Sequence, residues 1–211
     1  MASPLSAAPV ATAVNADGLA ARHDLNPEEV TPAVRAALVR LEAEVERLAA
    51  KVSDAELLAD LDTLTPILNR RAFERELQRA LAAAERYGEP LSLVYFDLND
   101  FKAINDVYGH AAGDAALQRV AETLTAHVRT SDMVGRLGGD EFAAALTRAS
   151  PEGAARRAAQ LASLIEAEPV QWRDRTFFLS VAHGVRPFEP GQSAAELLAS
   201  ADAAMYLRKR R

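Results

Sequence analysis

The sequence predicts an α+β fold, in which a single sheet carries helices mainly on one face and an extra helix precedes the sheet. Short apolar runs typical of buried strands alternate with longer stretches of helical periodicity. Two of these runs meet in RLGGDEFAAAL (136–146), a stretch typical of a hairpin. The extra helix is predicted by a heptad repeat near the N-terminus.

The composition is that of a globular chain with room for one core, because 211 residues are 49% hydrophobic and 26% charged. The absence of cysteine excludes disulfides, thiolate metal sites and thiol nucleophiles, and it fits a reducing compartment. A formal charge of −6 disfavours a nucleic-acid-binding surface. No apolar run reaches the ~18 residues of a membrane-spanning helix. We therefore expect a cytoplasmic protein that binds no nucleic acid and does not span the membrane.

The N-terminal region divides into two segments. Residues 1–28 are rich in Ala, Ser and Pro, lack the basic start of a secretory signal, and are expected to form a disordered tail. Residues 29–60 are expected to form a parallel coiled coil that makes the protein a homodimer. The alternative is an amphipathic helix folded back on its own domain. The heptad positions, spaced alternately by four and three residues, are Val34, Leu38, Leu41, Val45, Leu48, Val52 and Ala55.

The pattern of residues 61–211 predicts one domain of alternating helices and strands. The glycines of its hairpin, Gly138 and Gly139, are expected to take the positive φ that tight hairpin turns need. The expected elements are a helix at 71–87, a strand at 91–97, helices at 101–107 and 113–129, strands at 133–137 and 142–146, a helix at 151–168, strands within 175–188 and a helix at 194–208.

Three acidic residues are expected to converge on one edge of the sheet. Asp97 ends the buried strand LSLVYFD, where a carboxylate is costly unless it is solvated, paired or bound to a metal. If that strand neighbours the hairpin, Asp97 lies close to Asp140 and Glu141. Converging carboxylates in a chain without cysteine predict a site for a hard cation such as Mg²⁺. The alternative is a polar turn beside an unrelated acid.

Four motifs, in order along the chain, resemble those of the GGDEF-domain diguanylate cyclases, which condense two GTP into cyclic di-GMP and pyrophosphate. The resemblance covers nearly all of the predicted domain, and four ordered motifs are far more specific than a lone GGDEF. It implies a ferredoxin-like sheet of the nucleotidyl-cyclase type. The motifs are DTLTPILNRRAF (62–73), FDLNDFKAINDVYGHAAGDAAL (96–117), GGDEF (138–142) and ADAAMYLRK (201–209).

The resemblance implies a divalent metal cofactor, Mg²⁺ or Mn²⁺. Asp97, Asp140 and the carbonyl of Leu98 match the family's metal ligands. Asp140 also matches the residue credited with helping to deprotonate the attacking 3′-hydroxyl, and Glu141 beside it is required by the same pattern. Metal-assisted attack needs no covalent nucleophile, because the cation lowers the pKa of the hydroxyl and neutralises charge on the phosphates.

Two further groups of residues match substrate-binding positions. Lys102 and Lys209 match phosphate contacts, and the turn of Gly138 and Gly139 lets phosphates approach the backbone closely. Without the resemblance, an isolated lysine indicates a solvated surface charge.

The guanine-reading pair of the family matches Asn105 and Asp114. A carboxylate accepts hydrogen bonds from N1–H and the 2-amino group of guanine, whereas adenine would leave it unpaired at a cost of about 1 to 3 kcal/mol. We therefore expect GTP to be preferred to ATP. The alternative is that Asn105 caps a turn and Asp114 begins the following helix.

Arg129 and Asp132 form an Arg-x-x-Asp separated by five residues from Gly138. In the family this spacing marks a product-inhibition site. An arginine can bind guanine O6 and N7 while an aspartate accepts from another edge, so the pair suits cyclic di-GMP.

The sequence departs from the family pattern at several positions. Pro66 stands where glycine is usual and is expected to stiffen the junction with the coiled coil. Asn99 replaces a frequent acid, and His183 stands where an apolar residue is more usual and is expected to be a tolerated residue of an edge strand. The family commonly continues past the closing helix with Gly-Arg-Asn and a last strand, so we expect this sheet edge to differ.

The implied reaction requires two domains, because each holds one GTP and the 3′-hydroxyl of one attacks the α-phosphate of the other. No sensory domain is evident in the sequence, so regulation is expected through the tail, the coiled coil or a regulatory partner protein at the N-terminal helix. The competing interpretation is a non-catalytic receptor for GTP or cyclic di-GMP that signals through the coiled coil. The intact signature favours the enzyme.

Overall fold

The computed structural model describes residue 21, residue 26 and residues 31–209, with the backbone alone at residue 50 and residues 52–59. The predicted tail therefore lies almost entirely outside the described residues. The chain divides into two units, residues 1–56 and residues 57–211. Among the described residues, no helix combines the length and the apolar character needed to cross a bilayer.

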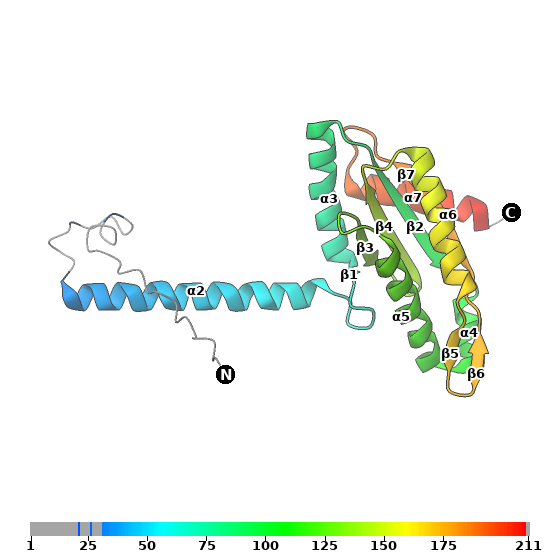
Figure 1. Cartoon of the computed structure of the whole chain (residues 1–211), viewed down its shortest axis with the longest axis horizontal. Helices are drawn as coiled ribbons and strands as arrows, with labels where there is room; N and C mark the ends of the chain where they lie inside the picture. Colours follow the sequence, from blue (N-terminus) through cyan, green and yellow to red (C-terminus); the bar gives the residue numbers. More distant parts are fainter. Residues whose placement is uncertain (1–20, 22–25, 27–30, 210–211) are drawn as a thin grey trace, which may run out of the picture. The chain divides into compact units, whose positions relative to one another are not determined.

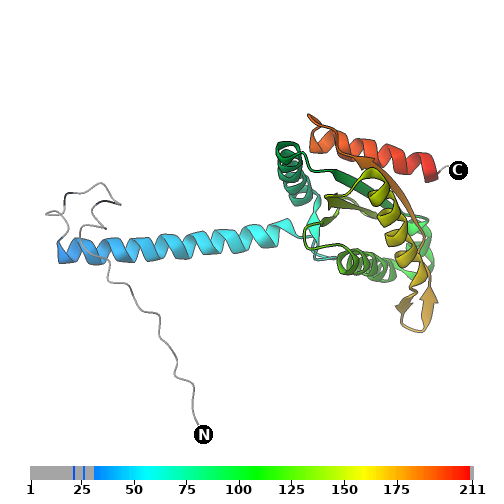
Figure 2. The same cartoon turned by 45° about the horizontal axis from the view of Figure 1, so that its top comes forward.

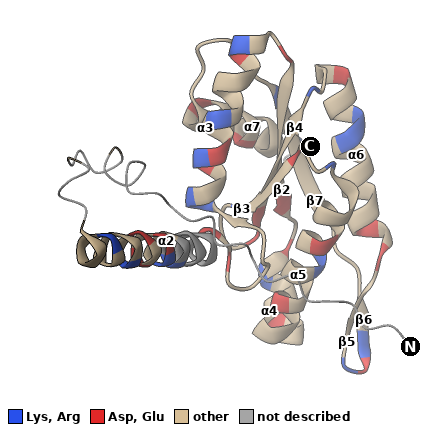
Figure 3. Ribbon diagram, turned by 60° about the vertical axis from the view of Figure 1, so that its left-hand side comes forward, with Lys and Arg blue, Asp and Glu red and all other residues tan. Residues whose placement is uncertain are grey.

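The predicted N-terminal helix is present as α2, Pro32–Asp60. It begins at Thr31, whose hydroxyl accepts a hydrogen bond from the backbone N–H of Val34 at 3.3 Å, and at Pro32, a favoured first residue. Charged residues of both signs cover α2 (Figure 3). The predicted heptad positions Leu41, Val45 and Leu48 are 61%, 64% and 48% exposed. α2 thus carries apolar side chains in contact with solvent.

Residues 57–211 form a five-stranded mixed sheet of strand order β1-β3-β4-β2-β7. β1 is parallel to β3, and the other neighbours are antiparallel. A sheet with packed helices confirms the predicted α+β fold, and β3 and β4 form the predicted hairpin. The strands are β1 Leu68–Asn69, β2 Leu91–Leu98, β3 Met133–Arg136, β4 Glu141–Thr147 and β7 Val181–Pro187.

Helices cover both faces of this sheet, so the expectation of helices mainly on one face was wrong (Figures 1 and 2). One core lies between the sheet and helices α5 and α6, and includes Val94 and Phe96 of β2. The other lies between the sheet and helices α3 and α7, and includes Leu93 and Tyr95. Alternate residues of a strand point to opposite faces, so the continuous apolar run of β2 is what a sheet covered on both sides requires.

The helices of this unit lie close to their predicted positions. α3 begins at the cap Asn69, whose side chain accepts from the backbone of Ala72, and ends at Gly88 in the left-handed conformation. α5 begins three residues earlier than predicted, directly after Gly109. The helices are α3 Arg70–Tyr87, α4 Phe101–Tyr108, α5 His110–His127, α6 Pro151–Ala167 and α7 Ala194–Lys209.

A second, two-stranded sheet was not fully predicted. β5 (Val170–Trp172) and β6 (Arg175–Phe177) pair as a hairpin between α6 and β7. The ring of Phe177 stacks on Tyr108 of α4 with centroids 4.6 Å apart. β6 falls within the stretch predicted to contain strands, but β5 is only three residues long and carries no clear alternation.

Candidate active site

The predicted acids lie together at one edge of the sheet, the one at which β2 ends and β4 begins. Asp97, near the end of β2, is paired in register with Glu141 at the start of β4. The backbone N–H of Leu98 donates to the carbonyl of Asp140 at 3.2 Å. Antiparallel neighbours with this register hold the end of one strand beside the beginning of the other. Within the described part of the chain, no group of three acidic or histidine side chains forms a metal-binding cluster by itself.

The Asp97 carboxylate already lies beside a positive charge. It forms an ion pair with the ammonium of Lys209, in the last turn of α7. The side chain of Asp97 is 16% exposed and that of Lys209 is 36% exposed. A partly buried carboxylate needs such compensation, because its hydration is incomplete.

Glu141 points under the glycine turn. A Cβ on Gly138 would lie 2.3 Å from Oε2 of Glu141, so only glycine lets this carboxylate approach. The Glu141 carboxylate lies near enough to the hydroxyl of Tyr95 to affect its ionisation. Burial, and then the Glu141 carboxylate, raise the pKa of Tyr95 well above its ordinary value, so that this hydroxyl is a donor at neutral pH.

The expectation of positive φ angles at Gly138 and Gly139 was wrong, because neither glycine adopts one. Four residues, 137–140, separate β3 from β4, and a reversal over four residues does not need the primed turn of a two-residue hairpin. A Cβ on Gly139 would meet nothing within 4 Å. The turn is therefore open on the side of Gly139 and closely packed at Gly138.

Arg136 holds this turn and was not among the predicted site residues. Its Nε donates to the carbonyl of Gly138 at 3.1 Å, and its Nη2 to the carbonyl of Gly139 at 2.7 Å. Its Nη1 donates to Oδ1 of Asp62 at 3.0 Å. The hydroxyl of Thr65 donates to the same oxygen at 2.7 Å. The segment that follows α2 is thus tied through one arginine to the signature turn.

The environment of Asp62 favours its charged form. Burial opposes ionisation, but hydrogen bonds from Thr65 and Arg136 outweigh it and hold the pKa of Asp62 below its ordinary value. The signal in the sequence was an aspartate three residues before Thr65 and an arginine two residues before the glycines. Neither feature alone indicates that Asp62 and Arg136, which are 74 positions apart in the sequence, are in contact.

The predicted guanine-reading residues lie at the contact between α4 and α5. A Cβ on Gly113 would lie 2.0 Å from Oδ1 of Asn105, so the amide of Asn105 packs directly on the first turn of α5. Asp114, the next residue of that turn, is exposed. The structure thus brings Asn105 and Asp114 to one place. Lys102 is exposed on the first turn of α4.

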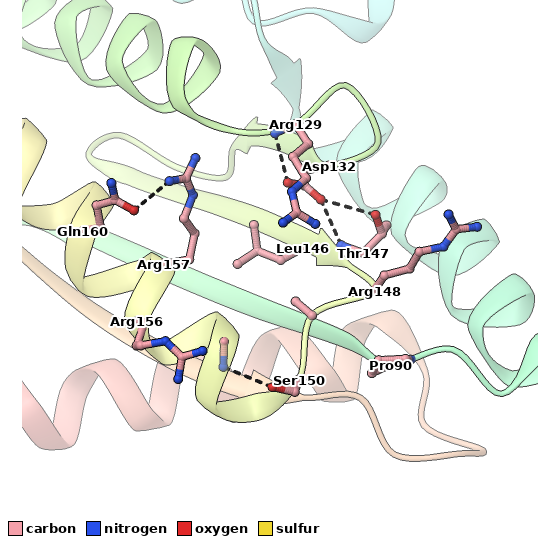
Figure 4. Close-up of a pocket in the computed structure, with 12 residues that line it drawn as sticks. Pro90, Arg129, Asp132, Leu146, Thr147, Arg148, Ser150, Arg156, Arg157 and Gln160 are labelled. Carbon is pink, nitrogen blue, oxygen red and sulfur yellow. Dashed lines mark hydrogen bonds between the residues drawn. The ribbon is translucent and has the colours of Figure 1, made fainter.

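Arg129 and Asp132 line a separate cavity of about 610 Å³ (Figure 4). Both oxygens of Asp132 are engaged: Oδ2 accepts from the backbone N–H of Arg129 at 3.0 Å, and Oδ1 from that of Thr147 at 3.0 Å. Asp132 therefore shapes the loop before β3. Arg156 and Arg157 of α6 line the facing wall, and Asp132 is the only carboxylate among the described residues that line this cavity.

The fold and the edge of the sheet define an α+β domain of the nucleotidyl-cyclase class. Residues 59–211 match the family model described as "Diguanylate cyclase, GGDEF domain". The chain therefore belongs to the GGDEF-domain family, as its motifs predict.

Several relatives share this domain. The chain is 38% identical over 152 residues to the diguanylate cyclase DosC of Escherichia coli K12, covering 72% of this chain and 33% of DosC. It is 41% identical over 152 residues to the diguanylate cyclase TpbB of Pseudomonas aeruginosa PAO1, covering 71% of this chain and 35% of TpbB. The chain thus spans about a third of the length of these relatives.

Solved structures share the fold. The coiled coil and GGDEF domain of DgcB from Caulobacter crescentus, in complex with c-di-GMP, match with a TM-score of 0.75 and 31% identity, over 84% of this chain and 94% of that one. SiaD from Pseudomonas aeruginosa, in complex with its activator SiaC, matches with a TM-score of 0.70 and 25% identity, over 92% of this chain and 76% of that one.

Proposed function

We propose that the protein is a diguanylate cyclase that converts two GTP into cyclic di-GMP and two pyrophosphates. In each of two condensations the 3′-oxygen of one GTP forms a bond to the α-phosphorus of the other, and the bond from that phosphorus to the bridging oxygen of pyrophosphate breaks. Asp140 helps to take the proton of the attacking hydroxyl. The observation that carries the proposal is the meeting of Asp97, Asp140 and the open glycine turn at one sheet edge.

The residues at this edge fit a divalent cation. The carboxylates of Asp97 and Asp140 and the carbonyl of Leu98 would hold it, and all three are the oxygen donors that Mg²⁺ and Mn²⁺ prefer. The ammonium beside Asp97 supports this assignment, since it occupies a place that favours a positive charge. A bound cation supplies charge neutralisation at the phosphates and a lower pKa for the attacking hydroxyl.

The remaining residues bind and orient the substrate. Asn105 and Asp114 hydrogen-bond to guanine, and the packing of Asn105 against Gly113, the residue before Asp114, supports a single base-binding site. Lys102 and Lys209 bind phosphates. The open side of Gly139 admits phosphate oxygens to the backbone, while Glu141 keeps the turn in shape from beneath.

The active form is proposed to be a homodimer joined by a parallel coiled coil of α2. The exposed leucines and valine of α2 support this assembly, since a second copy would cover them. The similar DgcB structure also contains a coiled coil and a GGDEF domain. Holding two domains together raises their effective concentration for a reaction that needs both.

Product inhibition is proposed at the cavity of Arg129 and Asp132. Arginines on two walls of this cavity and few acids suit the two phosphates and the guanines of cyclic di-GMP. Two DgcB structures similar to this chain, one of the coiled coil with the GGDEF domain and one of the GGDEF domain, are complexes with c-di-GMP. A regulatory protein acting through the N-terminal helix is proposed as the input, by comparison with SiaD and its activator.

One assay tests the activity. Purified full-length protein is incubated with GTP and Mg²⁺, and cyclic di-GMP is measured by chromatography. We expect product from the wild type and none from Asp140→Ala, with ATP as a poor substrate. A wild type that binds GTP but yields no product at any protein concentration would contradict the proposed cyclase activity and favour the non-catalytic receptor.

A further inference from the structure

The β5–β6 hairpin lies beside α4, the helix that carries Asn105 (Figure 1). The base of the hairpin is buried in the core that the sheet forms with α5 and α6, where Val170 is 3% exposed and Phe177 is 6% exposed. The strands of the hairpin pair in register from this base to the contact of Trp172 with Arg175. The hairpin is therefore anchored in the core and presents side chains of β6 to α4.

α4 has little burial of its own. None of its residues is fully buried. Three side chains at helical spacing, those of Phe101, Ile104 and Tyr108, are partly buried and pack against the core. A single residue, Gly109 with a φ of 87°, joins α4 to α5. The packing of these three side chains therefore decides how α4 lies.

Two residues of β6 hold Tyr108 at the end of α4. The ring of Phe177 stacks on that of Tyr108, with 4.6 Å between the centroids and 20° between the planes. The guanidinium carbon of Arg175 lies 5.9 Å from the centroid of the Tyr108 ring, a distance at which a cation is attracted to an aromatic face. Arg175 and Phe177 are two residues apart, so both point to the same side of the strand.

The position of Tyr108 affects Asn105. The two residues are three apart in α4 and are therefore neighbours on its surface. Asn105 has no spare room beside α5, because a Cβ on Gly113 would lie 2.0 Å from its Oδ1. A change in the tilt of α4 at Tyr108 would therefore move the Asn105 amide relative to Asp114. Hydrogen bonds to one base from both side chains require a fixed separation, because their distances and angles are narrowly limited.

We propose that the β5–β6 hairpin sets the affinity for guanine, with Arg175 and Phe177 as positioning residues that act on Asn105 through Tyr108. The inference deepens the proposed function, on which it rests for the role of Asn105 in binding guanine. Phosphate binding should not depend on the hairpin. The first turn of α4, which carries Lys102, is held by β2, from which residues 99 and 100 alone separate it.

The same hairpin offers a matched control. The guanidinium carbon of Arg173 lies 5.7 Å from the centroid of the Trp172 ring, so its contact is of the same kind and of similar length. This contact stays within the hairpin, whereas that of Arg175 reaches α4. In the part of the chain that the structure describes, neither arginine forms an ion pair. Each substitution thus removes one exposed charge and one ring contact.

Isothermal titration of the full-length protein with GDP, and separately with ADP, each in the presence of Mg²⁺, tests the proposal. We expect Arg175→Ala to weaken GDP binding about threefold, which corresponds to ~0.7 kcal/mol. ADP binding should be unchanged, because ADP lacks the base that Asn105 recognises. Arg173→Ala should bind both nucleotides as the wild type does.

Two substitutions of Tyr108 separate positioning from a general loss of structure. Tyr108→Phe keeps the stacked ring and should retain the affinity for GDP, whereas Tyr108→Leu lacks the ring and should weaken GDP binding about tenfold at unchanged ADP affinity. Hydrogen exchange of the α4 amides in the ligand-free protein, followed by mass spectrometry, should be faster in Arg175→Ala and unchanged in Arg173→Ala.

The outcomes distinguish this inference from the proposed activity. If Arg175→Ala binds GDP about threefold more weakly than the wild type, at unchanged ADP affinity, the inference stands even when no cyclic di-GMP is formed. If cyclic di-GMP is formed but Arg175→Ala and Tyr108→Leu bind GDP as tightly as the wild type, the inference is overturned while the activity stands. An equal loss of GDP and ADP affinity, the same loss in Arg173→Ala, or a wild type without preference for GDP also overturns it.

Discussion

Replacing Arg136 by alanine should destabilise the domain much more than replacing an arginine in an exposed ion pair of the same length. The side chains of Arg136 and Asp62 are 14% and 23% exposed, and their atoms lie 3.0 Å apart. The side chains of Arg148 and Glu89 are 73% and 41% exposed, with 2.9 Å between their atoms. The two pairs differ chiefly in burial, and Arg136 additionally binds the carbonyls of Gly138 and Gly139.

The magnitude follows from these contacts. Breaking a fully buried ion pair costs about 3 to 5 kcal/mol, and exposed pairs contribute about 0.2 to 1 kcal/mol. Arg136 is partly buried and its loss also removes the side-chain donor to two backbone carbonyls, so we expect Arg136→Ala to lower the free energy of unfolding by about 2 kcal/mol. For a domain of this size that is a decrease in Tm of roughly 4 to 8 °C. Arg148→Ala should stay within about 0.5 kcal/mol of the wild type.

Urea denaturation monitored by circular dichroism measures both variants. An m-value equal to that of the wild type shows that the change lies in stability and not in compactness. The reasoning fails if Arg136→Ala and Arg148→Ala lose the same free energy of unfolding, since burial would then make no difference to this pair.

Three further predictions concern the product site, the assembly and the pH dependence of stability. Arg129→Ala should weaken inhibition by cyclic di-GMP at least tenfold and leave the initial rate unchanged; an unaltered inhibition curve would remove the assignment. Leu41→Glu with Val45→Glu should disrupt the dimer in analytical ultracentrifugation and make the specific activity rise with protein concentration; a dimer that persists would contradict the coiled coil. The pKa of Asp62 lies below its ordinary value of 3.8, so its ionic contacts contribute stability above that pH and lose it as the pH falls through the folded-state pKa. The stability advantage of the wild type over Asp62→Asn, measured by thermal unfolding, should therefore shrink below about pH 3.8, and a constant difference down to pH 2 would contradict this account.

Most elements of the domain could be predicted because their local signals agree with the final packing. The helix that ends at Gly88 is bounded by a capping asparagine and a left-handed glycine, and both are visible in the sequence. β2 could be located from its apolar run, but its two-sided burial was misjudged. A continuous apolar run by itself indicates a strand covered on both faces, and α3 and α7 are the helices that supply the second cover.

The sequence predicts those site residues that adjacent strands bring together, and it does not predict contacts between residues far apart in the chain. Asp97 and Asp140 could be placed together because Asp97 lies near the end of β2 and Asp140 directly precedes β4, and adjacent antiparallel strands bring such positions together. Arg136 was missed because its partner Asp62 lies 74 residues away, and no periodic pattern reports a contact of that kind. The conformation of the glycine turn was misjudged because the length of the connection, and not its glycine content, decides the turn.

The ion pair between Asp97 and Lys209 reduces the electrostatic repulsion that the proposed anionic substrate would meet at the acidic edge of the sheet. A carboxylate that faced solvent alone would repel incoming phosphates, whereas the ammonium from α7 cancels its charge while the site is free of ligand. Under the proposed function, a triphosphate that arrives with a divalent cation would offer each member of the pair a new partner, phosphate oxygens for Lys209 and the cation for Asp97. Both charges would then stay compensated during binding. We therefore expect Lys209→Ala to weaken GTP binding. We expect the same substitution to increase the affinity for Mg²⁺ alone only slightly, because it removes one neighbouring positive charge.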